Sequence, residues 1–123
     1  MKSLNKGLSL MVLLTAGLVP AVPLSSIAGE ASPQKVTITA TEFALEPNPV
    51  TIDSGESVKL VMRNEGALAH NIKIDALGVT SDTIQTGKTA TVSLRNPEPG
   101  TYTIYCTVPG HKQAGMKAKL EVK

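Results

Sequence analysis

The only cysteine of this chain stands on a short segment with a histidine and a methionine, at equal steps. The segment from Thr103 to Met116 reads TIYCTVPGHKQAGM, so Cys106, His111 and Met116 occupy positions five apart. A thiolate, an imidazole and a thioether therefore lie close together along the chain. Sulfur ligands combined with imidazole suit copper better than they suit magnesium, calcium or manganese. The spacing predicts a metal site, and it requires a fold that brings a further ligand to this loop.

His70 is the candidate for that further ligand, because it is the only other histidine in the chain. Two histidines and a cysteine in a plane, with a weak axial methionine, form the ligand set of blue-copper electron-transfer sites. Structural zinc takes its ligands from cysteine, histidine and carboxylate, and a thioether suits it poorly. Taken singly, a free thiol, a core histidine and a packed methionine would each be ordinary. Together they predict one copper ion per chain, held by His70, Cys106, His111 and Met116 and cycling between Cu(I) and Cu(II).

The beginning of the chain has the layout of a secretory signal peptide. Two lysines form a basic start, an apolar run extends from Leu8 to Val19, and small side chains at Ser26 and Ala28 suit a cleavage site. The run is short for a membrane helix, which needs about 20 apolar residues; an uncleaved anchor is the alternative. We therefore expect residues 1–28 to be removed and residues 29–123 to form one periplasmic or extracellular domain.

The charge balance excludes an obvious nucleic-acid surface. The whole chain carries a formal charge of +2, but without Lys2 and Lys6 ten Lys and Arg residues face ten Asp and Glu residues. A nucleic-acid-binding protein would present a basic patch or stripe, and the sequence contains no such run. We expect no nucleic-acid partner.

The rest of the chain alternates between apolar and polar residues, as half-buried strands do. The segments with this period are Lys35–Ala40, Val50–Ile52, Val58–Arg63, Asn71–Asp75, Thr89–Leu94, Thr101–Cys106 and Met116–Lys123. Turn residues separate them, and Glu42–Pro49 reads as a loop with two prolines. About seven to eight short strands without an amphipathic helix predict an all-β antiparallel sandwich.

The parity of these strands places three of the four candidate ligands on core-facing sides, because successive side chains of a strand alternate between faces. Cys106 continues the face of Ile104, Met116 begins the apolar face of the last strand, and His70 shares a face with Ile72. We therefore expect these three ligands at one end of the sandwich, with His111 supplied by the loop. The same parity turns Asn71 outward.

The loop from Cys106 to Met116, together with the pair His70-Asn71, resembles the type 1 copper cupredoxins, the family of plastocyanin, azurin, auracyanin and rusticyanin. The five-residue steps are closer to auracyanin and rusticyanin than to plastocyanin. Thr41-Glu42-Phe43, Ser54-Gly55-Glu56 and Asn64-Glu65-Gly66 are similar to small bacterial and archaeal plastocyanin-like domains. The resemblance implies a Greek-key fold, three equatorial ligands (His70, Cys106 and His111) and Met116 as the axial ligand.

The resemblance also implies a function and partners. His111 would be the point where electrons enter and leave, inside an apolar rim of Ala67, Leu68, Val108, Pro109, Gly110 and Ala114. Asn71 would tie the two ligand loops together by hydrogen bonds, which requires a departure from regular strand geometry. We expect a monomeric electron carrier that docks with redox proteins near His111 and meets membranes only through membrane-bound partners.

Three other functions use parts of the same sequence. A copper carrier or buffer would use the same four ligands and is the main alternative. A copper enzyme would need further histidines or an open coordination position, and a cysteine nucleophile activated by His111 is conceivable. A metal-free adhesive sandwich would not respond to copper. The ligand set favours a protein that is not an enzyme.

Overall fold

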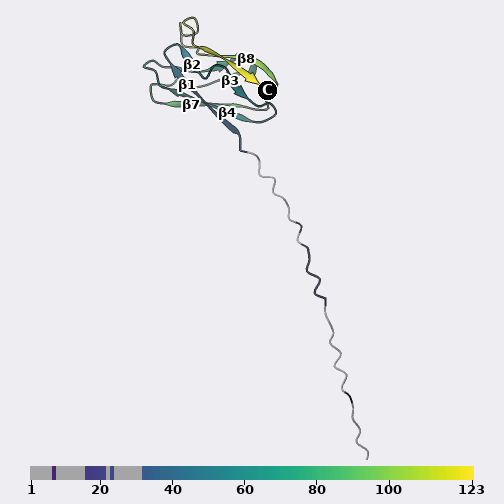
Figure 1. The fold of residues 1–123 in the computed structure, drawn as a ribbon. Coiled ribbons are helices and arrows are strands. Elements are labelled where there is room, and N and C mark those ends of the chain that lie inside the picture. The colour runs from purple at the N-terminus through teal and green to yellow at the C-terminus, as the bar shows by residue number, and fades with distance from the viewer. Residues whose placement is uncertain (1–6, 8–15, 22, 24–31) are drawn as a thin grey trace, which may run out of the picture.

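Two facing sheets of short strands form the domain in this computed structural model (Figure 1). The structure describes residues 7, 16–21, 23 and 32–123. The predicted cleavage point after Ala28 and most of the predicted signal peptide lie outside these residues. Among the residues described, no helix is both long enough and apolar enough to cross a membrane.

The first sheet has four strands and the second has five. The order in the first sheet is β2 (Ala44–Glu46), β1 (Gln34–Thr41), β4 (Val58–Asn64) and β7 (Thr89–Leu94). The order in the second sheet is β3 (Val50–Ile52), β9 (Lys117–Val122), β8 (Gly100–Tyr105), β5 (Lys73–Ile74) and β6 (Val79–Thr80). A single 3₁₀ turn, η1 (Asp75–Leu77), joins β5 to β6. The predicted β-sandwich is confirmed.

Two strand pairs are parallel, whereas the sequence analysis expected antiparallel pairing. β1 runs parallel to β4, and β3 runs parallel to β9; the other pairings are antiparallel. After β2 the chain leaves the first sheet, adds β3 to the second sheet and returns as β4. Such a crossover makes a parallel neighbour possible, because a tight hairpin connects only antiparallel strands.

Two strands, β2 and β6, were not predicted, and β2 is the one that bears on the candidate site. Ala44–Glu46 lies in the segment expected to be a loop, yet it pairs with the end of β1 through Thr39–Glu46 and Thr41–Ala44. Three residues between a turn and a proline are too few for a period to be recognised in the sequence. The consequence is a two-residue turn, Glu42-Phe43, directed at the end of the sandwich where the candidate ligands gather.

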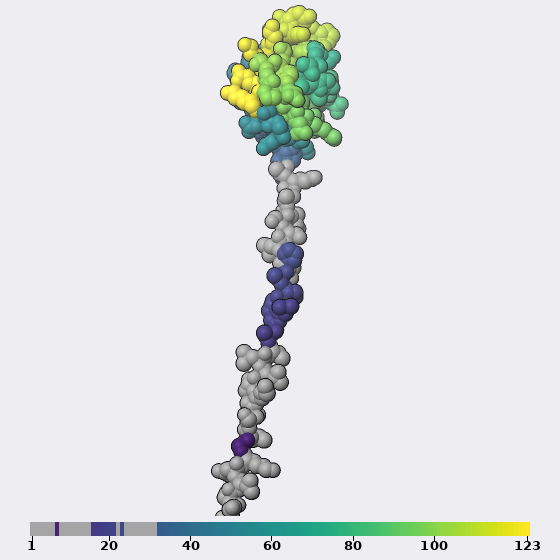
Figure 2. All heavy atoms as spheres, turned by 90° about the vertical axis from the view of Figure 1, so that its right-hand side faces the viewer, coloured from purple at the N-terminus to yellow at the C-terminus, as the bar shows by residue number. Residues whose placement is uncertain are grey.

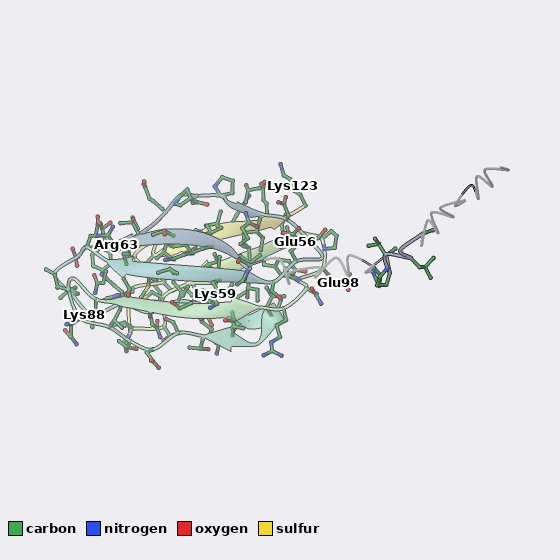
Figure 3. The ribbon with its side chains drawn as sticks, turned by 90° about the horizontal axis from the view of Figure 1, so that it is seen from below. Glu56, Lys59, Arg63, Lys88, Glu98 and Lys123 are labelled. Atoms are coloured by element: carbon green, nitrogen blue, oxygen red, sulfur yellow. The ribbon has the colours of Figure 1, made fainter. Side chains whose placement is uncertain are left out.

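The core lies between the sheets and is almost entirely aliphatic. Its fully buried members include Ile38, Leu45, Ile52, Leu60, Met62, Ile72, Ile74, Ile104 and Leu120. Burying a side chain of this size contributes about 1.5–3 kcal/mol, so no disulfide is needed for one modest core. Polar side chains cover most of the outside of the first sheet, and Lys59 and Arg63 project there from β4 (Figure 3).

The loop after β8 covers one pole of the sandwich. Figure 2 shows it in yellow-green at the end remote from the start of β1. The outer face of the second sheet is seen in the same view, with β8 beside β9. Everything that positions the candidate ligands lies at this pole.

Candidate metal centre

Cys106, His111 and Met116 lie on a loop that its own backbone closes. Tyr105, the last residue of β8, pairs with Lys117, the first residue of β9, so the sheet brings the loop's two ends together. The Cys106 N–H donates to the Met116 carbonyl (3.1 Å), and the Met116 N–H donates to the His111 carbonyl (3.0 Å). The three candidate ligands of this loop are therefore linked through their main chain.

His70 comes from the segment between β4 and β5. An isolated bridge joins it to Ile84, with hydrogen bonds of 3.1 Å from the His70 N–H and 2.9 Å back to the His70 carbonyl. The imidazole of His70 is fully buried, as are the side chains of Cys106 and Met116. The burial of all three side chains agrees with the strand parity, which placed them on core-facing sides.

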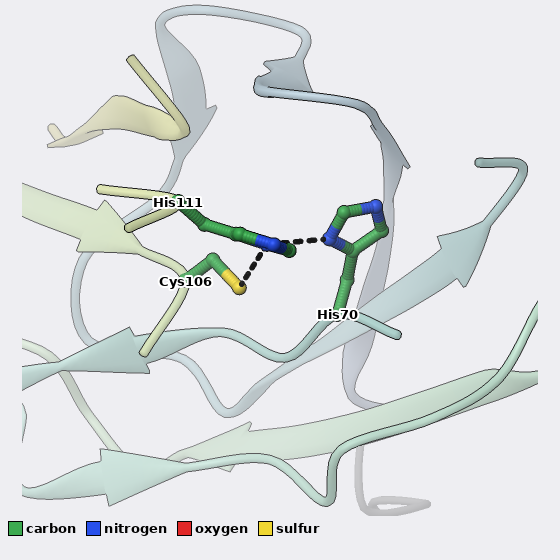
Figure 4. Close-up of side chains that lie close together, drawn as sticks. All are labelled: His70, Cys106 and His111. Atoms are coloured by element: carbon green, nitrogen blue, oxygen red, sulfur yellow. Dashed lines mark hydrogen bonds between the residues drawn. The ribbon is translucent and has the colours of Figure 1, made fainter. Parts of the chain in front are cut away.

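The metal-binding atoms of three candidate ligands converge on one point (Figure 4). Nδ1 of His70 lies 3.2 Å from Nδ1 of His111, and Sγ of Cys106 lies 3.6 Å from Nδ1 of His111. These atoms all lie within 4.8 Å of one another. Two histidines 41 residues apart and the sole cysteine therefore form one buried cluster.

These separations fit one first-row metal ion. With bonds of about 2.0–2.1 Å to nitrogen and about 2.3 Å to sulfur, as zinc makes them, three donors in a plane around one ion lie roughly 3.5–3.8 Å apart. The observed 3.2 and 3.6 Å are close to those values. Two imidazole nitrogens and one thiol sulfur match the preferences of copper. The residues present are therefore consistent with one type 1 copper site.

The environment of His70 favours the neutral imidazole that a metal requires. The pKa of His70 lies below its ordinary value, mainly because burial disfavours the charged ring, and the nearby His111 lowers the pKa further. The hydrogen bond with Glu42 raises the pKa but does not outweigh these effects. A metal-bound histidine has to be deprotonated at the ligating nitrogen. The site therefore disfavours the protonated ring before any metal is added.

Asn71 turns inward, contrary to the strand parity. The segment from His70 to Ile72 is not a regular strand, since β5 begins only at Lys73. Asn71 is buried, donates from Nδ2 to Oγ1 of Thr107 (2.7 Å) and accepts the Thr107 N–H at Oδ1 (2.7 Å). The departure from strand geometry that the family resemblance required is present, and it links the segment of His70 to the segment of Cys106.

A second buried asparagine shapes the loop before His70. Asn64 donates from Nδ2 to the carbonyls of Leu68 (2.8 Å) and Ile84 (2.9 Å), and its Oδ1 accepts the Gly66 N–H (2.9 Å). A buried amide with three partners leaves little freedom to the loop around it. The Asn64-Glu65-Gly66 motif by itself does not predict this role of Asn64, because the partners Leu68 and Ile84 depend on the fold.

The Glu42-Phe43 turn touches both histidines, and sequence analysis did not place it at the site. Oε1 of Glu42 lies 3.3 Å from Nε2 of His70. The ring of Phe43 meets the ring of His111 edge to face, with centroids 5.4 Å apart and planes at 83°. Phe43 adopts a left-handed backbone conformation (φ 63°), which costs a bulky residue on the order of 1–3 kcal/mol. No sequence signal identifies these contacts, because they depend on β2.

The surface above the centre is largely apolar. In residues 32–123, the large apolar side chains that are exposed are Phe43 (42%) and Leu68 (46%). The predicted rim residues Ala67, Pro109, Gly110 and Ala114 are also exposed, and Val108 is half-buried. His111 is 6% exposed while His70 is 0% exposed. Of the two histidines, His111 is the one that reaches this surface.

The sequence is similar to a known protein family and to several of its members. Residues 10–122 match the family described as cupredoxin-like domain. Plastocyanin from Prochlorothrix hollandica is 32% identical over 127 residues, covering 94% of this chain and 89% of that protein. Plastocyanin from Ulva prolifera is 35% identical over 90 residues, covering 66% of this chain and 88% of that protein.

Solved structures agree with the fold. Auracyanin B superposes with a TM-score of 0.66 at 26% identity, covering 75% of this chain and 91% of that one. Auracyanin A from Chloroflexus aurantiacus, which is described as a "blue" copper protein, superposes with a TM-score of 0.65 at 23% identity, covering 75% and 100%. The second likeness bears on the fold alone.

Proposed function

This chain belongs to the cupredoxin-like family, and on that premise we propose that it is a mononuclear blue copper protein that carries single electrons between redox proteins. The observation that carries the proposal is the convergence of Nδ1 of His70, Nδ1 of His111 and Sγ of Cys106 within 4.8 Å. These three side chains would be the equatorial ligands, and Met116 would be the axial one. The plastocyanins and auracyanins to which the chain is similar support this reading.

The residues of the site suit electron transfer better than catalysis. When bound, copper supplies a one-electron couple between Cu(II) and Cu(I). Four protein ligands leave no open position of the kind that a catalytic metal keeps for substrate. The hydrogen bonds of Asn71 and Asn64 hold the two ligand segments in place. Ligands that cannot move suit a site that must accept and lose an electron with little rearrangement.

The route for the electron would pass through His111. Its ring lies against Phe43, and the exposed side chains of Phe43 and Leu68 form an apolar surface beside it. A redox partner that covers this surface would come close to an imidazole bound directly to the metal. Docking would then depend mainly on apolar contact, because the domain expected after cleavage has no net charge to steer a partner from a distance.

The place of action and the assembly state are part of the same proposal. A signal peptide in residues 1–28 would export a monomeric domain to the periplasm or the cell exterior. Its partners would be an electron donor and an electron acceptor, soluble or membrane-bound. Nucleic acid would not be among them, since the chain lacks a basic stripe.

One spectrum tests the assignment. Purified protein loaded with Cu(II) is expected to show intense visible absorption from charge transfer between the Cys106 sulfur and copper, together with the paramagnetic-resonance signature of a type 1 site. The Cys106→Ser variant should lack this absorption. A wild-type protein that binds Cu(II) without this absorption would reject the assignment. Copper retained through repeated reduction and reoxidation separates an electron carrier from a copper buffer, which would release the ion.

A further inference from the structure

Glu42 reaches the buried imidazole of His70 from the side opposite the metal-binding atoms. Its Oε1 lies 3.3 Å from Nε2 of His70, whereas Nδ1 of the same ring faces His111 at 3.2 Å. The side chain of Glu42 is 38% exposed and that of His70 is 0% exposed. The Glu42 carboxylate therefore lies between the buried imidazole of His70 and the protein surface.

This contact determines which nitrogen of His70 carries the proton. An ionised carboxylate only accepts hydrogen bonds, so Nε2 has to be the donor. In a neutral imidazole with a proton on Nε2, Nδ1 has a free lone pair. Nδ1 is the atom that faces His111, on the side of the ring where the three candidate ligands converge. The carboxylate thus selects the tautomer that can bind a metal at the cluster.

We propose that Glu42 is a positioning residue of the copper site: it fixes the tautomer and the ring orientation of His70 and favours the oxidised ion through its negative charge. The inference rests on the proposed function. Partners of this kind, which receive the second N–H of a metal-bound histidine, orient the ring and raise its basicity. The more basic ligand and the added negative charge both stabilise Cu(II) more than Cu(I).

The surroundings hold Glu42 in this position from several sides. Its Oε1 also accepts the Leu68 N–H at 2.9 Å, and this bond is the main cause of the lowered pKa of the Glu42 carboxyl. Gly66 packs so closely that an added Cβ would clash with the carboxyl group of Glu42. The β1–β2 pairing fixes the turn at its base through Thr41 and Ala44. Glu42 is thus constrained by a backbone donor, a neighbour without a side chain and a hairpin.

The arrangement differs from an ordinary surface ion pair. Pairs between two exposed charges contribute little to stability, because water and salt screen them. Here the histidine is fully buried, and its Nε2 lies 3.3 Å from Oε1 of Glu42, which makes the contact a hydrogen bond from the imidazole to a carboxylate. Such bonds are stronger than those between neutral groups.

The experiment compares three variants of the full chain. Glu42→Gln removes the negative charge but keeps an oxygen that can accept a hydrogen bond from the Nε2–H of His70. Glu42→Ala removes the charge and the hydrogen-bond acceptor. Glu65→Gln is the matched control, because Glu65 is an exposed carboxylate of the neighbouring loop that pairs with Arg63 (3.5 Å) and not with His70. The measurements are the reduction potential with copper, the affinity for Cu(II), and the nitrogen-15 spectrum of the His70 ring in protein loaded with Zn(II).

The expected results separate charge from tautomer. Glu42→Gln should keep a proton on Nε2 and lower the ratio of Cu(II) to Cu(I) affinity about tenfold, which is a rise in potential of about 59 mV. Glu42→Ala should raise the potential in the same way. In addition, its Nε2 proton should exchange with water, and its metal binding should be about 10- to 100-fold weaker. If both variants match Glu65→Gln in potential, affinity and ring spectrum, the inference is wrong. Failure of the proposed function gives another result. The copper-loaded wild type would then lack the blue absorption, while the nitrogen-15 spectrum of the zinc-loaded protein would still show whether Glu42 fixes the tautomer of His70.

Discussion

Asn71 and Thr107 exchange two hydrogen bonds of 2.7 Å, one from the amide of Asn71 to Oγ1 and one from the Thr107 N–H to Oδ1. Each residue directly follows a candidate ligand, His70 or Cys106. The pair therefore joins the two segments that contribute to the metal centre and lie 36 residues apart. Its loss would remove the side-chain link beside the two ligands and leave the strand pairing of Lys73 with Tyr105 as the neighbouring link between the segments.

We expect Asn71→Ala to destabilise the domain by about 1–3 kcal/mol, because it leaves the Thr107 N–H without its partner. The variant should also bind copper more weakly, since the side-chain link directly beside the two ligands is lost. Thr107→Val removes one bond and keeps the other; because it leaves Nδ2 of the buried Asn71 without its partner, a loss of about 1–3 kcal/mol is expected for it as well. Urea unfolding with and without copper measures both effects. Equal stability of Asn71→Ala and wild type would contradict the linking role.

Met116→Gln should keep copper and lower its reduction potential, because an amide oxygen stabilises Cu(II) better than a thioether does. The axial ligand is one of the main determinants of potential in such sites. A tenfold change in relative affinity corresponds to about 59 mV. Met62→Leu is the control, since Met62 is buried in β4 away from the ligand set and a Met-to-Leu exchange is tolerated. Cyclic voltammetry measures the potentials, and an unchanged value for Met116→Gln would mean that Met116 is not axial.

Leu68→Glu and Ala114→Glu should slow electron exchange with a partner, roughly tenfold at low salt, and leave the copper spectrum as it is. Both side chains are exposed beside the centre, so a new charge there opposes apolar docking without touching a ligand. Ser93→Glu adds the same charge on β7, near the opposite pole, and should have no effect. Stopped-flow exchange with a small redox protein gives the rates. If the three variants exchange equally fast, the docking surface lies elsewhere.

The metal-free protein should lose stability as the pH falls from 7.5 to 5.5. Burial lowers the pKa of His70 in the folded state below its ordinary value of 6.5, so the unfolded chain binds the proton first. Protons taken up only by the unfolded chain favour unfolding, and the loss begins near that ordinary value. The lowered pKa of Glu42, caused mainly by the Leu68 N–H, acts in the same direction at lower pH. Urea midpoints measure the slope, which should be flatter in His70→Gln; a slope of the opposite sign would contradict the argument.

The candidate ligands could be predicted because chemistry and backbone geometry restrict them closely. The chain has two histidines and one cysteine, and Cys106 and Met116 end segments whose alternation decides which way each side chain points. Those local rules hold in β8 and β9, where Ile104, Ala118 and Leu120 are buried as expected. Parity also predicted that His70 is buried, but its convergence with Cys106 and His111 depends on the irregular segment before β5 and on the loop after β8.

The sequence by itself thus determined the candidate ligands, the fold class and the faces of the strands, because these depend on residue type and on a period of two along one strand. Only the tertiary structure decided that Asn71 turns inward, that β1 lies parallel to β4, and that Glu42 contacts His70 across 28 residues. These features depend on which strands become neighbours and on how an irregular segment or a two-residue turn bends. Local alternation carries no information about either, since the contacts join segments that are distant along the chain.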